Sequence, residues 1–376
     1  MDRETSITDK FKCLGKACPD TCCKGWQILV DDKTNEAAKS VKGLCGLILR
    51  HNIKKYPERV IRMKKGVCPF LRDGLCSHEI DGNLSLQPLV CRVFPRRVMW
   101  FGGELEETLE LACPECARLF LTYGAELVPA KHEIVPHSQK KYDEEEIFIH
   151  LYAVRDFLAG CTRMSDSDTL SLINKTMGWA HRAHFLILTD RMQEIEYDMG
   201  STADVPAFEK NDLITHSVIN HIVLDIIDEG RYRYENEKLS RLISLYKKHL
   251  MNASDEEFKA YLRAAENSLS SACPGLKNKY NEYFSYALIR LLPFMSENYL
   301  LLDTVIFGAV YTLLLMSFDA ALVLEGEKMD ISMQSLYMAA FEKRVWHNAG
   351  ISAELSDFVR NLAGKACNNY SDMLFS

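Results

Sequence analysis

Cysteines are the residues of this sequence whose number and spacing indicate chemistry. Ten of the thirteen cysteines lie within the first 116 residues. Thiolates are soft ligands that suit zinc and iron–sulfur clusters, and four of them complete a tetrahedral zinc site or a four-iron cluster. Ordinary buried thiols are the alternative, but free cysteines are normally few and scattered. The sequence therefore predicts metal binding in its N-terminal part, with enough candidates for one site or two.

The spacing favours iron over zinc. Zinc ribbons use paired CxxC knuckles, and in this region only Cys113 and Cys116 have that form. Cys18, Cys68 and Cys113 are each followed by proline, as happens at some ferredoxin ligands. Many basic residues surround the cysteines, and nearby cations lower the pKa of a thiol. We expect an iron–sulfur cluster, with zinc as the alternative.

Charge divides the chain into two parts. Residues 12–100 carry 17 Lys and Arg against 8 Asp and Glu, whereas the whole chain has a net charge of −7. The remainder is therefore strongly acidic. The overall negative charge argues against a general nucleic-acid-binding protein, which needs a broad positive surface. A hydrophobic content of 47% excludes a wholly disordered chain.

The first ten residues are too polar for the apolar core of a secretory signal. Clustered cysteines in a protein that is not exported bind metal more often than they form disulfides. The apolar run 304–318 is shorter than the roughly 20 residues of a membrane span, so it predicts a buried helix. We expect a cytoplasmic protein with neither membrane nor nucleic acid as a partner. The sequence leaves the oligomeric state open.

The fold class follows from the pattern of apolar residues. In the first part we expect a helix over residues 36–50, a turn at Asp73-Gly74, a β-hairpin over residues 98–111 and a helix starting at Pro114. Later segments have apolar residues at three- and four-residue spacing, which predicts helices. These segments are 143–161, 166–196, 212–228, 238–251, 255–272, 277–295, 300–324, 331–346 and 353–362.

We therefore predict a mainly α protein in two parts. Residues 1–128 form a small, irregular, cysteine-rich metal-binding module with a short β-hairpin. A linker covers residues 129–142, and residues 143–376 form a helical domain. The strand–loop–helix glycine motif of a Rossmann-type donor site is missing from the sequence.

Several motifs resemble one known family. The segment Phe11-Lys-Cys13-Leu-Gly-Lys-Ala-Cys18-Pro-Asp-Thr-Cys22-Cys23-Lys-Gly-Trp26 resembles the N-terminal signature of the flagellin lysine N-methylases. Cys68-Pro-Phe-Leu, Gly-Leu-Cys76, Cys91-Arg-Val-Phe-Pro-Arg96 and Cys113-Pro-Glu are similar too, and these segments also resemble the CxxCxxCC-type zinc- or iron-chelating proteins. Weaker similarities, such as Glu282-Tyr-Phe and Trp346-His347, extend over the helical part.

The resemblance implies a protein-lysine N-methyltransferase that modifies flagellin, its protein substrate, with S-adenosylmethionine as methyl donor. It also implies an iron–sulfur cluster, most simply 4Fe-4S. The cysteines that match the family motifs are Cys13, Cys18, Cys22, Cys23, Cys68, Cys76, Cys91 and Cys113. Cys116 fits the pattern less well, and the choice of four ligands stays open.

The catalytic residues and the course of the reaction also stay open. Arg92 and Arg96 are candidates to bind the carboxylate of the donor, to bind an acidic substrate, or to pair with local acids. Polar and radical methyl transfer are both compatible with the sequence. The alternative function is a non-catalytic protein in which iron or zinc only stabilises the basic module.

Overall fold

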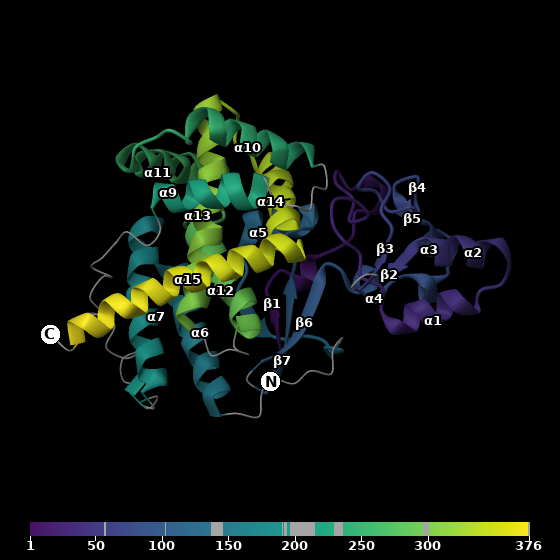
Figure 1. Ribbon diagram of the computed structural model, residues 1–376, viewed down its shortest axis with the longest axis horizontal. Coiled ribbons are helices and arrows are strands. Elements are labelled where there is room, and N and C mark those ends of the chain that lie inside the picture. Colours follow the sequence, from purple (N-terminus) through teal and green to yellow (C-terminus); the bar gives the residue numbers. More distant parts are fainter. Residues whose placement is uncertain are drawn as a thin grey trace.

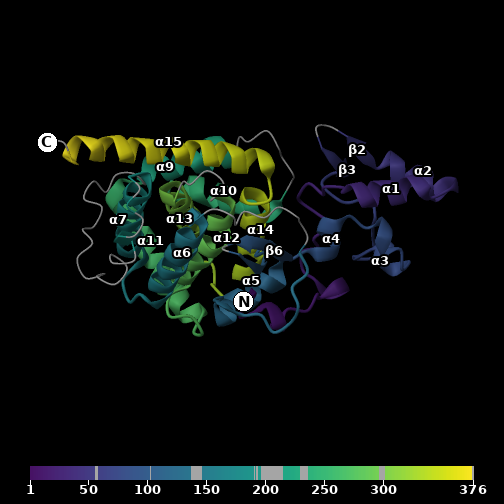
Figure 2. The same ribbon diagram turned by 90° about the horizontal axis from the view of Figure 1, so that it is seen from below.

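The computed structural model describes residues 1–55, 58–101, 103–136, 146–189, 191, 194–195, 215–228, 236–295 and 301–374. The predicted mainly α fold is confirmed, since 63% of the chain is helical. A large helical body surrounds one long central helix, α13 (Leu301–Glu325), and a smaller body projects from its side (Figures 1 and 2). The other helices of the large body are α5 (Pro114–Tyr123), α6 (Glu146–Met164), α7 (Thr169–Leu188), α9 (His216–His221), a π-helix (Ile222–Asp228), α10 (Glu237–His249), α11 (Asp255–Ala272), α12 (Lys279–Met295), α14 (Ile331–Val345) and α15 (Ala349–Leu374).

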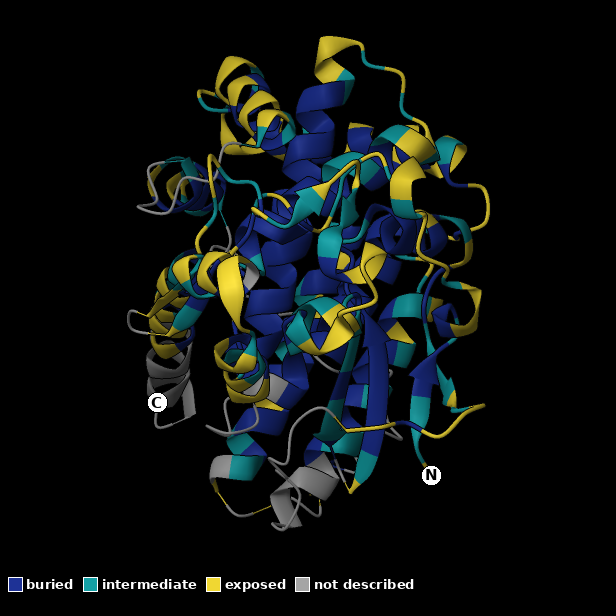
Figure 3. Cartoon of the chain, turned by 90° about the vertical axis from the view of Figure 1, so that its right-hand side faces the viewer, coloured by how far each residue is buried: buried dark blue, intermediate teal, exposed yellow. Residues whose placement is uncertain are grey.

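Helix α13 forms the centre of the larger core. Every residue from Leu301 to Leu322 is buried, as the dark central column in Figure 3 shows. A helix that is apolar on all sides must be covered on all sides, which α7, α10, α11, α12 and α15 achieve. Among the described residues, α13 is the helix long and apolar enough to cross a membrane, and it lies wholly inside the protein. The predicted buried helix is confirmed.

A small sheet lies against the helical body. It contains β1 (Arg3–Thr5), β6 (Arg96–Phe101), β7 (Glu104–Leu109) and β8 (Leu127–Pro129), in the order β6-β7-β1-β8. Strands β6 and β7 are antiparallel, which confirms the predicted hairpin, whereas β1 runs parallel to β7.

Polar contacts fix this sheet to the helices. Arg155 of α6 is fully buried and donates to Glu106 of β7 at 2.6 Å. The hydroxyl of Tyr286 in α12 donates to the Leu109 carbonyl oxygen at 2.6 Å and accepts from the Leu109 amide at 2.9 Å. The first strand and the hairpin are therefore part of the larger body.

The smaller body, which we call the cysteine-rich module, comprises residues 13–94. Its own core contains Trp26, Ile28, Val30 and Ile61. Its elements are short: α1 (Asp32–Ser40), α2 (Gly43–His51), β2 (Ile53–Lys55), β3 (Arg59–Ile61), β4 (Leu71–Arg72), β5 (Leu75–Cys76), α3 (Ser77–Ile80), α4 (Leu89–Val93) and the 3-10 turns Gly15–Ala17 and Leu84–Leu86. A further 3-10 turn, Thr8–Lys10, precedes the module.

The single helix predicted over residues 36–50 is wrong, because α1 and α2 are separate. Val41 and Lys42 adopt extended conformations between them. The Arg50 side chain holds this corner by donating to the carbonyl oxygens of Ala38 (3.1 Å) and Val41 (3.0 Å). The apolar spacing across both helices resembles that of one helix, so the periodicity of apolar residues does not reveal the break.

The two ends of the module leave the sheet at one place. Phe11 precedes the module and Arg96 follows it, and the Arg96 guanidinium lies 5.9 Å from the centre of the Phe11 ring. The predicted division at residues 129–142 stays a prediction, and residues 137–142 lie outside the described residues.

Candidate functional site

A cavity of about 450 Å³ opens in the cysteine-rich module where it meets the helical body. All eight cysteines predicted as metal ligands line it, and they come from five segments of the chain. They are Cys13, Cys18, Cys22, Cys23, Cys68, Cys76, Cys91 and Cys113. The structure thus brings the predicted set together, and metal binding by this set stays a prediction.

Backbone pairing brings Cys23 and Cys68 together. Lys24 and Val67 form an antiparallel bridge, and the Cys68 amide donates to the Cys23 carbonyl oxygen at 2.9 Å. The indole N–H of Trp26 donates to the Cys22 carbonyl oxygen at 2.6 Å. The buried indole therefore fixes the loop that carries the paired cysteines.

Short local elements place Cys76 and Cys91. Cys76 lies opposite Leu71 in the β4–β5 hairpin, whose turn at Asp73-Gly74 has φ values of 51° and 81°. Two consecutive residues with positive φ form the tight turn that such hairpins prefer. Cys91 lies on α4, and the Leu89 amide of that helix donates to Asp31 Oδ2 at 2.7 Å.

Cys113 connects the cavity to the helical body. It is the residue before α5, and Pro114 begins that helix as predicted. Cys116 follows one turn later with no exposed surface, packs in the larger core and does not line the cavity. The structure therefore separates Cys116 from the eight lining cysteines.

Thiol–thiol hydrogen bonds and burial determine the thiol pKa values here. The Cys23 thiol lowers the pKa of Cys68, and the Cys116 thiol lowers the pKa of Cys113. Burial raises the pKa of Cys91. A metal ion binds the thiolate form. Burial and thiol–thiol hydrogen bonds shift most of the set away from that form, because the pKa values of five cavity cysteines are raised and those of two are lowered. The lowering of thiol pKa values by nearby cations that the sequence suggested is therefore not seen for most of these cysteines.

Thiol–thiol hydrogen bonds bring cavity sulfurs together in pairs, Cys22 with Cys23 and Cys23 with Cys68. In tetrahedral zinc sites with bonds of about 2.3 Å, neighbouring sulfurs lie roughly 3.8 Å apart. Among the described His, Cys, Asp and Glu residues, one group of three has all its ligand atoms within 4.8 Å of one another. This group contains no cysteine. The cysteine set is therefore more open than a closed zinc site.

A lysine from the far end of the chain reaches this site. Lys343 of α14 is 2% exposed and donates to Asp20 Oδ2 at 2.6 Å and to the Thr21 carbonyl oxygen at 3.2 Å. A hydrogen bond with Cys23 and burial raise the pKa of Cys22, and the Lys343 charge opposes that rise. Sequence reasoning missed Lys343 because nothing local relates it to the cysteines.

Arg92 and Arg96 both line the cavity. Arg96 pairs with the buried carboxylate of Glu107, and Arg92 is exposed. Of the roles predicted for the two arginines, pairing with a local acid therefore applies to Arg96. Arg92 is accessible to a ligand.

His347 also approaches the module from the helical body. Its ring contacts the Trp26 ring edge-on at 4.9 Å, and Trp26 contacts Phe94 at 4.6 Å. The His347 Nε2 atom lies 3.5 Å from Glu110 Oε2. Trp26 thus packs between the cysteine loop and the helical body.

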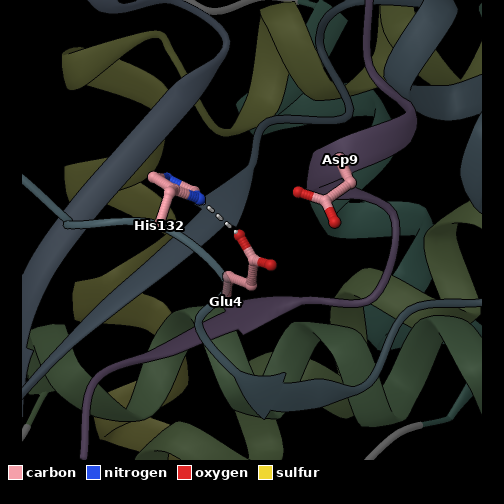
Figure 4. Close-up of side chains that lie close together, drawn as sticks. All are labelled: Glu4, Asp9 and His132. Atoms are coloured by element: carbon pink, nitrogen blue, oxygen red, sulfur yellow. Dashed lines mark ion pairs between the residues drawn. The ribbon is translucent and has the colours of Figure 1, made fainter.

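The close group of three without a cysteine consists of Glu4, Asp9 and His132, next to the sheet (Figure 4). Glu4 Oε2 lies 3.1 Å from His132 Nδ1, and Lys131 donates to Asp9 at 2.7 Å. Glu107 lies 3.3 Å from the other ring nitrogen of His132. Lys131 and the His132 ring already contact these carboxylates, so we interpret the group as a structural polar cluster.

Comparison with known proteins relates the chain to lysine methylation. It is 32% identical over 123 residues to a lysine-N-methylase of Salmonella choleraesuis (strain SC-B67) and 31% identical over 123 residues to that of Salmonella typhimurium. These matches cover 30% of this chain and 30% of each relative, so the chain spans about a third of their length. No family model and no solved structure matches the chain.

The flagellar biosynthetic protein FliU of Salmonella muenchen is 31% identical over 123 residues, 30% of this chain. That alignment covers 72% of FliU. Together with the motifs around the cavity cysteines, this similarity shows that the chain belongs to the flagellin lysine N-methylase family.

Proposed function

We propose that this protein transfers methyl groups from S-adenosylmethionine to lysine side chains of flagellin, and that it depends on an iron–sulfur cluster bound by the cysteine cavity. The convergence of eight cysteines on one cavity, in a relative of lysine-N-methylases, carries the proposal. The protein would act in the cytoplasm, before flagellin is exported.

The donor set fits a cluster with several irons. It consists of thiols alone, and its sulfurs are more widely spaced than those of a closed zinc site. Four of the eight cavity cysteines would hold a four-iron cluster. Such a cluster would supply a redox centre.

The residues of this chain would orient the reactants and exclude water. The substrate lysine must be neutral at Nζ, because its lone pair forms the new N–C bond while the C–S bond of the sulfonium breaks and the nitrogen loses a proton. A desolvated site beside cations lowers the pKa of a lysine. Arg92, which lines the cavity and is exposed, is our candidate to bind the donor carboxylate, while the pair with Glu107 holds Arg96 beside it.

Purification without oxygen tests the cluster. We expect brown protein that contains iron and acid-labile sulfide in equal amounts. Serine replacement of each cavity cysteine in turn should abolish the colour in at least four of the eight variants. Cys161→Ser is the matched control, because this exposed cysteine lies on α6 outside the cavity. Colourless protein with stoichiometric zinc would overturn the cluster and favour a structural metal.

Incubation with purified flagellin and S-adenosylmethionine tests the activity. Peptide mass spectrometry should show flagellin lysines that have gained the mass of one or more methyl groups. An intact cluster without modified lysines would show that the methyltransferase assignment is wrong.

A further inference from the structure

Exposed apolar side chains concentrate in the cysteine-rich module. Among the described residues, twelve large hydrophobic side chains are exposed, and seven of them belong to residues 13–94. These seven are Leu14, Leu29, Leu44, Leu47, Ile48, Ile80 and Leu84. Contiguous apolar surface on a folded protein often marks an interaction site.

Three of these side chains share one face of α2. Leu44, Leu47 and Ile48 are 73%, 59% and 49% exposed. Their three- and four-residue spacing places them next to one another on the helix surface. They form an apolar strip on α2, and this helix lies at the end of the module away from the helical body (Figure 1).

The outward orientation of this strip is fixed by the packing of the opposite face. Leu49 is only 3% exposed, and Arg50 ties the helix to the carbonyl oxygens of Ala38 and Val41. Gly46 approaches Val41 so closely that a Cβ atom at this position would lie 1.9 Å from the Val41 oxygen. The helix therefore cannot turn its leucines inward without losing these contacts.

Lysines lie on the segments that flank α2, and α1 and β2 both pack against that helix. Lys39 and Lys42 precede it, Lys54 and Lys55 follow it on β2, and all four are exposed. Within the described part of the chain, Lys54 and Lys55 have no carboxylate within ion-pair distance, and neither do Lys39 and Lys42. An apolar strip with a positive border complements a partner with apolar side chains and acidic neighbours.

We propose that the α2 surface (Leu44, Leu47 and Ile48 with the flanking lysines) docks an acidic, amphipathic segment of the protein substrate. This inference rests on the proposed function, which makes that substrate flagellin. A protein fits better than an anionic membrane, because α2 has only nine residues and presents three aliphatic side chains without an aromatic anchor.

The α2 surface is separate from the site of chemistry. No described residue of α2 lines the cavity, whose lining comes from other segments of the module, from Phe11, from the start of β6 and from residues 112–115 at the start of α5. Binding energy gained at a distance from the reacting atoms, equally in the ground and transition states, lowers KM and leaves kcat unchanged. Docking on α2 should therefore affect KM.

The test compares two double variants of the holoprotein. Leu44→Ser/Leu47→Ser removes the strip, and the control Val135→Ser/Met164→Ser removes two side chains of similar exposure (64% and 65%) outside the module. Affinity for purified monomeric flagellin is measured by biolayer interferometry. We expect at least tenfold weaker binding for the α2 variant and less than twofold for the control.

Steady-state kinetics of flagellin methylation and flotation with lipid vesicles complete the test. The α2 variant should raise KM for flagellin about tenfold with kcat within about twofold of the wild type. Unchanged affinity of the α2 variant, or no flagellin binding by the wild type, would overturn the docking proposal. The surface would be assigned to membranes instead under two conditions. The wild type would float with phosphatidylserine vesicles and the α2 variant would not, while both proteins bound flagellin with the same affinity. Flagellin binding without methyl transfer would refute the proposed function alone.

Discussion

Lys343 of α14 and Asp20 of the cysteine-rich module form an ion pair at 2.6 Å, between residues 323 positions apart in the chain. Asp20 lies between Cys18 and Cys22, so this pair connects the last third of the chain to the loop with the densest cysteines. The helical body therefore helps to shape the cavity.

Replacing Lys343 should loosen that loop. Lys343→Met leaves Asp20, which is 19% exposed, without its cation, and breaking such a pair costs about 3 kcal/mol. We expect this loss in urea unfolding and faster iron release to a chelator. The double variant Lys343→Met/Asp20→Asn should recover part of the loss, because no charge is then unpaired. Equal stability of all three proteins would contradict this role.

Glu282 should make stability depend on pH. This residue of α12 is 8% exposed, and burial raises the pKa of its carboxyl group to about 7. The fold favours the protonated form, so its contribution to stability is full at low pH and is lost as pH rises through about 7. Glu282→Gln removes this dependence. We expect the stability of the variant relative to the wild type to rise by about 2–3 kcal/mol between pH 5 and pH 8.

Urea unfolding at the two pH values measures this difference. Glu256→Gln is the control, because Glu256 is 86% exposed and is not one of the groups that shift the Glu282 pKa. Equal stability gains of Glu282→Gln at both pH values would exclude titration of Glu282 as the cause.

Two glycine substitutions should have opposite effects. Gly46→Ala places a methyl group against the Val41 carbonyl oxygen and should destabilise the α1–α2 corner by about 2–3 kcal/mol. Gly160 lies within α6, and the methyl group of an alanine there would have no neighbouring atom within 4 Å, so Gly160→Ala should stabilise by about 0.5–1 kcal/mol. Thermal unfolding of both variants checks the sign. A stable Gly46→Ala protein would show that the corner can relax.

The buried pair between Arg290 and Glu342 should be costly to break. The two side chains are 1% and 0% exposed, and Glu342 also accepts a hydrogen bond from Tyr283 at 2.7 Å. Glu342→Gln leaves the Arg290 charge buried with less compensation, at a cost of about 3–5 kcal/mol. Asp357→Asn, which breaks the exposed pair with Arg360, should cost less than about 1 kcal/mol. Similar losses in both variants would mean that burial does not decide the cost.

The sequence predicted most of the helical body because its signals are local. Ser254 and Glu257 form a capping box at the start of α11, and the long apolar run forms the buried α13. Apolar spacing missed the break at Val41, which depends on contacts of Arg50 and Gly46 with the preceding helix.

Part of the candidate site could also be predicted, because its cysteines are a local signal in the sequence. The cysteines stand out by type, and the resemblance to the family motifs selected the eight that line the cavity from the ten in the N-terminal part. Lys343 and His347 come from the other end of the chain, and only tertiary packing brings them to Asp20 and Trp26.

The proximity of Phe11 and Arg96 has a consequence for how the chain can be engineered. Two adjacent connections join the cysteine-rich module to the sheet, so the module can be removed or replaced as one unit. A short turn from Phe11 to Arg96 should reconnect β1 to β6 and leave the larger core intact. The module could then be exchanged between relatives as one piece, carrying seven of the eight cavity cysteines, while Cys113 stays with its host.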